Sequence, residues 1–367
     1  MMKTYRILLK PKGIIKDIPS SETLFGAICW GVRTLYGEKE LVKILNDYEG
    51  SKGKFIPSSA CPLLKSENGV IYCFPKPVIP DPEIKEMDET AAALKSKIIQ
   101  RAKVEIKEEN KLLFSKRIVL SQYRSFNKTK YLPESLFNRL VKGEKIIKLY
   151  YEYLEEELKI IKGGILITAN EFAKIGKESL MESRISARNK IDRLSFSTVP
   201  GGELYYEEEI YLNPRVFHLY FFLLTEDIDF FDPIFRWLSD TGIGGNRTVG
   251  RGYYEIKNEG EVKLPDATDK PLFIPLSKYL PAENEIDWDS EKNYYQLIPY
   301  QPRFDTMFFK GGEFIKERVT YLKEGSILQA KAKKEYYGRL YPAAKFQNQT
   351  IYQCGLTIPV FLKMAGQ

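Results

Sequence analysis

The sequence predicts an α+β protein, and three observations indicate this class. A strand-like segment, TYRILLK at 4–10, precedes a helix-like segment at 20–37. A run that is apolar at both parities, RVFHLYFFLLT at 215–225, precedes a second helix-like segment at 232–242. Helical periodicity also recurs between these two regions. At 367 residues, 43% of them hydrophobic, the chain is long enough for two domains with cores of their own.

The first helix is expected directly after the opening strand. Ser20 or Ser21 can cap its N-terminus, and apolar residues then recur at helical spacing as far as Leu35. Gly37 is well placed to end the helix.

The middle of the chain is basic and has helical character. Residues 90–115 are rich in Ala, Lys and Glu and predict a helix, 117–126 (RIVLSQYRSF) predict a strand, and 134–160 predict further helix. The net charge of the whole chain is +7, whereas Lys95 to Lys148 alone hold 15 basic and 5 acidic residues. This excess indicates either a basic patch for a polyanionic partner or a solvated helical face.

A β-hairpin, a buried strand and a helix are expected next. The stretch LSFST-VPGG-ELYYEEEIYL at 194–212 predicts the hairpin, with Gly201 and Gly202 in its turn. Residues 215–225 predict a central buried strand. In the following helix Asp232 is the expected cap, Pro233 takes the first position and Gly242 follows the end. A last strand is expected at 252–257.

The composition divides the chain into two domains. Residues 1–257 form the larger predicted domain, and 258–292 are acidic and proline-rich, as in a linker or long crossover. Residues 293–367 form a smaller, strand-dominated region.

The loop TGIGGNRTVGRGYYEI holds five glycines and two arginines within residues 242–252. Neither the Walker motif nor GxGxxG is matched, and the loop leads from a helix into a strand, the reverse of the order that those motifs need. Its amides and guanidinium groups suit phosphodiesters, whereas a tight turn is the purely structural alternative.

Catalytic and cofactor signals are absent from the sequence. His218 is the single histidine and lies in the most apolar segment, which favours a buried core residue. The four cysteines have no zinc-ligand spacing and suit a reducing cytoplasm, and no segment is long and apolar enough to cross a membrane. We expect a cytoplasmic, non-enzymatic binding protein without a metal or cofactor.

Three stretches taken together resemble the RAMP superfamily of CRISPR effector proteins. They are IPSSETLFGAICWGVRTLYG after the first strand, SARNKIDRLS…GELYYEEEIYL in the middle, and GIGGNRTVGRGYYEI. The tail CGLTIPVFLK resembles the last strand of such proteins. The chain is most similar to the subunit of the type III-A Csm complex that grips the 5′ repeat-derived handle of the guide RNA (crRNA). The paralogous subunit of the type III-B Cmr complex has the same plan.

The resemblance implies two ferredoxin-like (RRM-like) units, the second degenerate, with a β-hairpin thumb that kinks the RNA. It implies partners as well: the crRNA 5′ handle, the large polymerase/cyclase-like subunit and the backbone RAMP subunit. The thumb is expected around Pro200–Gly202, with 90–130 as the alternative. The RNA-binding residues are expected to be Ser20, Ser21, Arg188, Asn189, Arg193, Gly244, Gly245, Asn246, Arg247 and Arg251.

Alternative roles remain open from the residues. Arg184 and Asp192 suit structural salt bridges as well as RNA contacts. An endoribonuclease that processes precursor crRNA is disfavoured, because such enzymes often carry a histidine near the first helix, and none is present there. A purely architectural adaptor, whose basic patch faces another protein, is the second alternative role.

Overall fold

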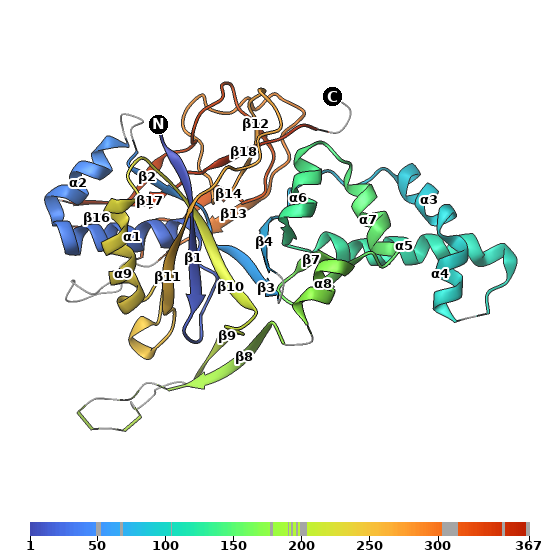
Figure 1. Cartoon of the computed structure of the whole chain (residues 1–367), viewed down its shortest axis with the longest axis horizontal. Coiled ribbons are helices and arrows are strands. Elements are labelled where there is room, and N and C mark those ends of the chain that lie inside the picture. The colour runs from blue at the N-terminus through green and yellow to red at the C-terminus, as the bar shows by residue number, and fades with distance from the viewer. Residues whose placement is uncertain are drawn as a thin grey trace.

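The structure is a computed structural model that describes residues 1–48, 53–66, 69–103, 105–176, 179–189, 191, 194–195, 197–198, 204–302, 315–346 and 349–364. A large mixed sheet is its central element (Figure 1). The strands of this sheet are β1 (Lys3–Pro11), β2 (Phe55–Pro57), β3 (Cys61–Ser66), β4 (Gly69–Pro75), β5 (Tyr131–Pro133), β6 (Leu158–Ile161), β7 (Ile165–Thr168), β10 (Phe217–Thr225) and β11 (Tyr254–Glu261). Their order is β11–β1–β10–β3–β4–β5–β7–β6, with β2 paired to β10, so the protein is α+β as predicted.

The interior strand β10 lies between β1 and β3 and is buried along its whole length. It pairs antiparallel with β1, where Ile7 lies opposite Phe221, and β1 pairs antiparallel with β11 on its other side. A strand covered on both faces needs apolar residues at both parities, which is the pattern that predicted it. The strands expected at 4–10, 215–225 and 252–257 are therefore confirmed.

Two helices cover one face of this sheet, α1 (Ser21–Tyr36) and α9 (Asp232–Thr241), and α2 (Glu38–Asp47) follows α1. A Cβ on Gly31 of α1 would lie 2.5 Å from Cγ2 of Ile234, so a glycine allows the two helices to pack closely. Both helices were predicted, and Gly37 and Gly242 follow their ends. Asp232 is the first residue of α9, however, and Phe231 occupies the cap position expected for it.

Residues 84–175 build a helical region beside the far end of the sheet. Its helices are α3 (Ile84–Ala93), α4 (Lys95–Ala102), α5 (Lys111–Asn127), α6 (Glu134–Val141), α7 (Ile146–Leu154) and α8 (Ala169–Ile175), with a short 3₁₀ turn, η1 (Glu108–Asn110). The predicted strand at 117–126 is wrong, because these residues belong to α5. Its buried residues Ser115, Val119 and Phe126 recur at helical spacing, and its basic residues face solvent.

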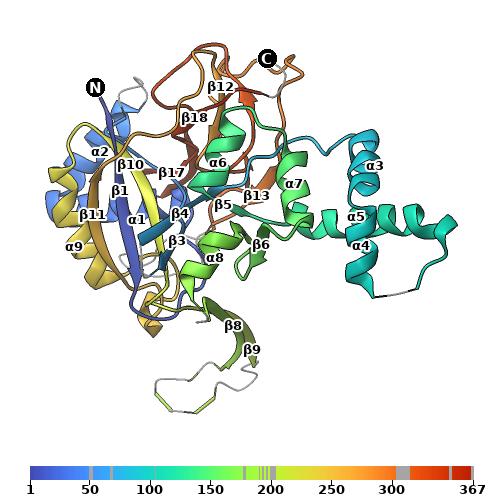
Figure 2. The same cartoon turned by 45° about the vertical axis from the view of Figure 1, so that its right-hand side comes forward.

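A two-stranded ribbon projects from the body of the molecule (Figures 1 and 2). It consists of β8 (Met181–Arg188) and β9 (Tyr205–Leu212), paired antiparallel from Met181–Leu212 to Arg188–Tyr205. The sequence correctly indicated a hairpin that ends at Leu212, but the partner strand is 181–188 rather than 194–198. The expected turn at Pro200–Gly202 lies outside the described residues.

The C-terminal third consists of short strands and turns, without a helix among its described residues beyond Gly250. Its strands are β12 (Leu272–Pro275), β13 (Leu297–Tyr300), β14 (Val319–Leu322), β15 (Leu328–Gln329), β16 (Leu340–Phe346), β17 (Gln349–Cys354) and β18 (Pro359–Phe361). The segment expected as a linker or crossover contains β12, which is buried between β15 and β18. Ser277 Oγ donates a hydrogen bond to the Pro57 carbonyl, 3.1 Å away, which ties this third to the large sheet.

Candidate nucleic-acid interface

The glycine loop between α9 and β11 contains glycines of two kinds. Gly252 has φ 72°, and a Cβ there would lie 2.2 Å from the carbonyl oxygen of Ile243, so the fold itself requires glycine. Gly242 and Gly244 also have positive φ, 79° and 89°. Gly245 differs from these, because its φ is not positive and a Cβ on it would meet nothing within 4 Å. The fold therefore gives no reason for a glycine at position 245.

A buried ion-pair network fixes the end of this loop to the ribbon. The Arg251 side chain is 2% exposed and donates to Glu207 Oε2 at 2.7 Å and to Glu209 Oε1 at 2.5 Å. Asn246 Nδ2 donates to Glu207 Oε1 at 3.1 Å. The loop and β9 thus hold each other through charge-assisted hydrogen bonds, which are stronger than neutral ones.

The ribbon completes the network from its other strand. Arg188 Nη2 lies 2.6 Å from Glu209 Oε1, Arg184 Nε lies 3.0 Å from Glu209 Oε2, and Ser186 Oγ donates to the same oxygen. Hydrogen bonds from Ser186 and Arg188 lower the pKa of Glu209 to about 2, although partial desolvation opposes them. The salt-bridge alternative predicted for Arg184 is therefore observed.

Arg247 begins a 3₁₀ turn, η3 (Arg247–Val249), directly after Asn246, which is left-handed at φ 61°. Its carbonyl accepts hydrogen bonds from Gly250 N and from the Tyr253 hydroxyl at 3.0 and 3.3 Å. Its side chain is partly exposed, in contrast to that of Arg251. The two loop arginines therefore face different environments.

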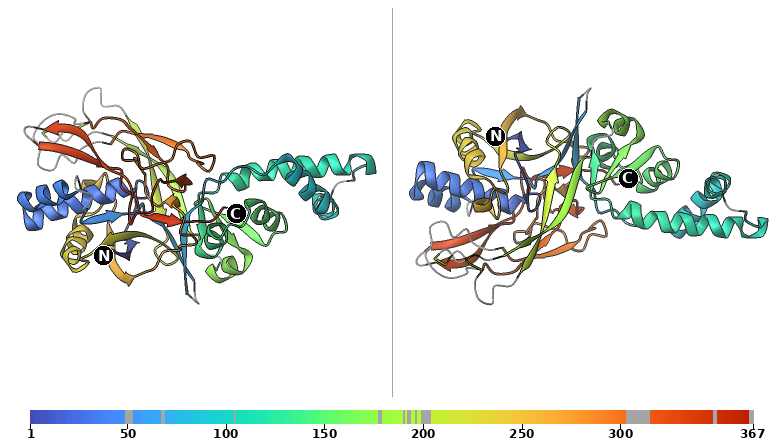
Figure 3. Two further views of the ribbon diagram at one scale, coloured as in Figure 1. Left: turned by 90° about the horizontal axis from the view of Figure 1, so that it is seen from above. Right: turned by 90° about the horizontal axis from the view of Figure 1, so that it is seen from below.

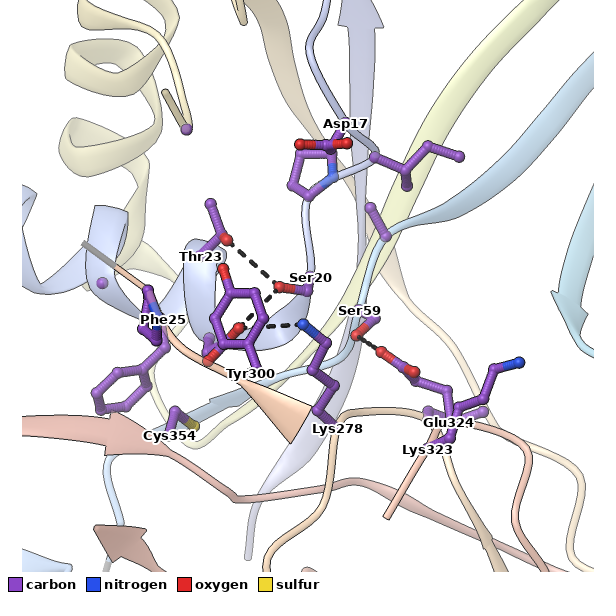
Figure 4. Close-up of a pocket in the computed structure, with 18 of the residues that line it drawn as sticks. Asp17, Ser20, Thr23, Phe25, Ser59, Lys278, Tyr300, Lys323, Glu324 and Cys354 are labelled. Atoms are coloured by element: carbon purple, nitrogen blue, oxygen red, sulfur yellow. Dashed lines mark hydrogen bonds and ion pairs between the residues drawn. The ribbon is translucent and has the colours of Figure 1, made fainter. Parts of the chain in front are cut away.

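The loop forms one wall of a groove of about 2300 Å³. The N-terminus of α1 supplies a second wall, and residues of the C-terminal third lie opposite (Figure 4). Nine basic and six acidic side chains line the groove among the described residues. A groove with a net positive lining suits a single-stranded polyanion.

Lys278, from the C-terminal third, closes the groove against α1. Its Nζ lies 3.1 Å from Glu22 Oε1 and 3.7 Å from the centre of the Tyr300 ring (Figure 4). Burial raises the pKa of Glu22, and the ammonium of Lys278 opposes that shift. On the groove wall formed by β4 and α5, burial lowers the pKa of Lys76 to about 8.

The predicted site residues of α1 have different exposures. Ser20 lines the groove, and its Oγ lies 3.3 Å from Thr23 Oγ1 and 3.4 Å from Glu22 Oε1. Its hydroxyl makes no capping hydrogen bond, although Ser20 is the N-cap residue. Ser21 is fully buried, and its amide donates to Ser59 Oγ at 3.0 Å. Only Ser20 of this pair faces the groove.

The structure brings together only part of the predicted set. Gly244, Gly245, Asn246 and Arg247 line the groove with Ser20. Arg188 and Arg251 belong to the ion-pair network, Asn189 is exposed just beyond β8, and Arg193 lies outside the described residues. The sequence did not indicate Lys278, Tyr300 or Lys323, because no motif links residues so distant from the loop.

The described residues lack two features of a catalytic centre, a metal cluster and an accessible histidine. Within the described residues no group of three or more His, Cys, Asp or Glu side chains is arranged to hold a metal ion. His218 is fully buried, its Nε2 lies 2.8 Å from the Pro214 carbonyl, and burial lowers its pKa, so the predicted core histidine is confirmed. Among the described helices none has the length and apolarity to cross a bilayer.

Comparison with known proteins identifies the family. The sequence model of the RAMP superfamily matches residues 16–255, which include α1, the ribbon and the glycine loop. The chain belongs to the RAMP superfamily, as a Csm4-like member.

Two curated relatives carry the name "CRISPR system Cms protein Csm4". The protein from Methanocaldococcus jannaschii is 31% identical over 307 residues, which cover 76% of this chain and 70% of that protein. The protein from Thermococcus onnurineus is 25% identical over 371 residues, which cover 99% and 98%.

Two solved structures share the fold. A chain of a Csm3–Csm4 subcomplex from the type III-A CRISPR-Cas interference complex has a TM-score of 0.58 and 20% identity, and the match covers 98% of this chain and 99% of that one. A chain of a Csm1–Csm4 cassette in complex with pppApA has a TM-score of 0.52 and 19% identity over the whole of both chains.

Proposed function

We propose that this chain is the non-catalytic RNA-binding subunit of a type III-A CRISPR (Csm) effector complex. It holds the 5′ repeat-derived handle of crRNA in the groove between the glycine loop and α1. The observation that carries the proposal is Gly245, which lines the groove although neither its φ nor its packing requires glycine. A backbone without a side chain at that point allows RNA to approach closely.

The chemistry of the groove supports single-stranded RNA as the ligand. RNA of this kind is bound by basic side chains along its backbone and by aromatic or guanidinium faces that stack on its bases. Arg247 and Lys323 line the groove and supply basic groups, whereas Lys278 already pairs with Glu22 and lies over the Tyr300 ring. Arg251 and Arg188 act indirectly, because their guanidinium groups already hold Glu209 and keep the loop and ribbon in place.

Partners follow from the family. The similar structures are named for Csm1–Csm4 and Csm3–Csm4 assemblies, so we assign this chain a large subunit and a backbone subunit as neighbours.

We also propose that the fold comprises two ferredoxin-like units, the second degenerate, divided at about 258–292. The ribbon β8–β9 is the proposed thumb, because it projects from the body beside the glycine loop.

Substitution of Gly245 tests RNA binding in this groove. Gly245→Leu has room to fold but would obstruct RNA, so we expect the affinity for a handle-bearing RNA to fall by about one to two decades. Val249→Leu is the matched control, since Val249 is 59% exposed in the same loop and does not line the groove. Equal affinities for wild type and a folded Gly245→Leu variant would refute RNA binding at this position.

A further inference from the structure

The helix α5 extends away from the sheet in an arm formed by α3, α4 and α5 (Figures 1 and 3). Its inner face is buried at Ser115, Val119 and Phe126, where it packs against its helical neighbours α3, α4 and α7. At about 100° per residue, these three positions lie within about 40° of one another around the helix axis. The inner face of α5 is therefore buried in the packing of the helical region.

The opposite face carries a regular pattern, which we name the Leu–Arg stripe: Leu113, Arg117, Leu120 and Arg124. Successive members are four, three and four residues apart, so all of them lie within about 60° of one another and extend over about 16 Å. Leucine alternates with arginine along this line, and each type repeats after seven residues.

The stripe is exposed, and its two arginines form no ion pair among the described residues. Leu113 and Leu120 are 51% and 57% exposed, and both arginines are exposed as well. Neither Arg117 nor Arg124 forms an ion pair with another described residue. Residues 111–133 contain six basic side chains and no acidic one, and the neighbouring carboxylates Glu108 and Asp88 pair with Lys111 and Lys116 rather than with the arginines of the stripe.

These features define the chemistry of an occupant. Exposed leucines seven residues apart form the apolar seam used in helix–helix pairing, and flanking charges select the partner. An unpaired guanidinium is best matched by a carboxylate, which it binds bidentately. We propose that the Leu–Arg stripe docks an amphipathic helix of a partner protein, with apolar residues seven apart and Asp or Glu beside them.

Apolar residues distinguish this partner from RNA. The C-terminal end of α5 reaches the groove through Tyr123, Asn127 and Lys128, so a continuous RNA track along the helix is the competing occupant. RNA would use the arginines but would leave both leucines in water, whereas a protein helix buries all four side chains. The leucines therefore favour protein.

The inference rests on the proposed function in one respect: the partner is expected among the other subunits of the reconstituted complex. Three double variants separate the contributions: Arg117→Glu with Arg124→Glu, Leu113→Ala with Leu120→Ala, and the control Lys85→Glu with Lys107→Glu. The control lysines are exposed elsewhere on the arm and carry the same charge. Binding of each variant to each separate subunit and to oligouridylate RNA is measured, with circular dichroism to confirm folding.

We expect the charge-reversal and leucine variants each to bind one subunit at least about tenfold more weakly, while their affinity for oligouridylate stays unchanged. The control variant should bind every subunit as the wild type does. Cross-linking at position 121, on the edge of the stripe, should then reach an acidic helix of that subunit. Unchanged affinity for every subunit would overturn the docking site, and a loss confined to oligouridylate would assign the stripe to RNA. Handle binding by the isolated chain is a separate measurement, so failure of the proposed function would be seen independently.

Discussion

Arg247 and Arg251 are separated by three residues in one loop, yet their environments differ. Arg251 is enclosed between two carboxylates of β9, whereas the partly exposed side chain of Arg247 lines the groove. Burial decides the difference, because a buried guanidinium requires carboxylate partners that an exposed one does not. The same residue type therefore lies in a buried carboxylate network at position 251 and on the groove wall at position 247.

Replacement of Arg247 should weaken RNA binding without loss of the fold. Arg247→Ala removes a charge-assisted contact of about 1.5–3 kcal/mol, so affinity for a handle-bearing RNA should fall by roughly one to two decades. A contact to phosphate would also make the salt dependence shallower by about one charge. A salt titration of binding measures both, with Lys257→Ala as the control, since Lys257 is exposed on β11 outside the groove. Unchanged affinity and unchanged salt dependence for a folded Arg247→Ala variant would show that the loop is only a turn and does not bind RNA.

Glu209 should make stability depend on pH in the acid range. Its pKa in the folded state is about 2, below the ordinary value of 4.5. A lowered carboxyl pKa stabilises the fold above the unfolded pKa, and this stabilisation is lost as pH falls from about 5 towards 2. Glu209→Gln should reduce stability at neutral pH and flatten the acid dependence. Urea unfolding at pH 7, 5 and 3 measures this, and parallel pH profiles for the two proteins would contradict it.

At the scale of elements, one glycine sets how closely α1 approaches α9. Gly31→Ala places a methyl group against Ile234 and should cost about 1–3 kcal/mol of unfolding free energy. Gly26→Ala is the matched control in the same helix, because its Cβ meets nothing within 4 Å and should stabilise by roughly 0.5–1 kcal/mol. Denaturant unfolding of both variants tests this, and equal effects would show that the helices can separate without cost.

The ribbon and α5 show why element type was harder to predict than element position. Residues 117–126 hold isoleucine, valine and tyrosine, which favour strands, but burial of Val119 and Phe126 against α3 and α7 selects the helix. The ribbon strand β8 reads MESRISAR and has no buried residue, so no core-facing pattern marked it, and its arginines Arg184 and Arg188 pair with Glu209 of β9.

For the whole molecule, we expect RNA binding without cleavage and without metal. No described residues form a metal cluster, and His218 is fully buried in β10. Handle RNA incubated with the pure protein should stay intact, and EDTA should change its affinity by less than about twofold. The measurement is gel analysis of labelled RNA with and without magnesium. Turnover by the pure protein that His218→Ala abolishes would restore the endoribonuclease alternative.

Elements whose signal is local could be predicted from the sequence. Apolar residues at both parities fixed β10, and terminal glycines together with helical periodicity fixed α1 and α9, because those patterns follow from the geometry of a single element. The glycine loop was also recognisable, since its composition is unusual over a few residues. The same local reading assigned Arg251 to RNA, whereas the structure encloses it between Glu207 and Glu209.

Which residues face the groove depends on tertiary packing. Lys278 and Tyr300 meet α1 across more than 250 residues of sequence, and the ion pairs of Arg251 join two elements more than 40 residues apart. Such neighbours are created by packing of the C-terminal third against the sheet. Exposure and charge partners are properties of that packing, and no local pattern encodes them.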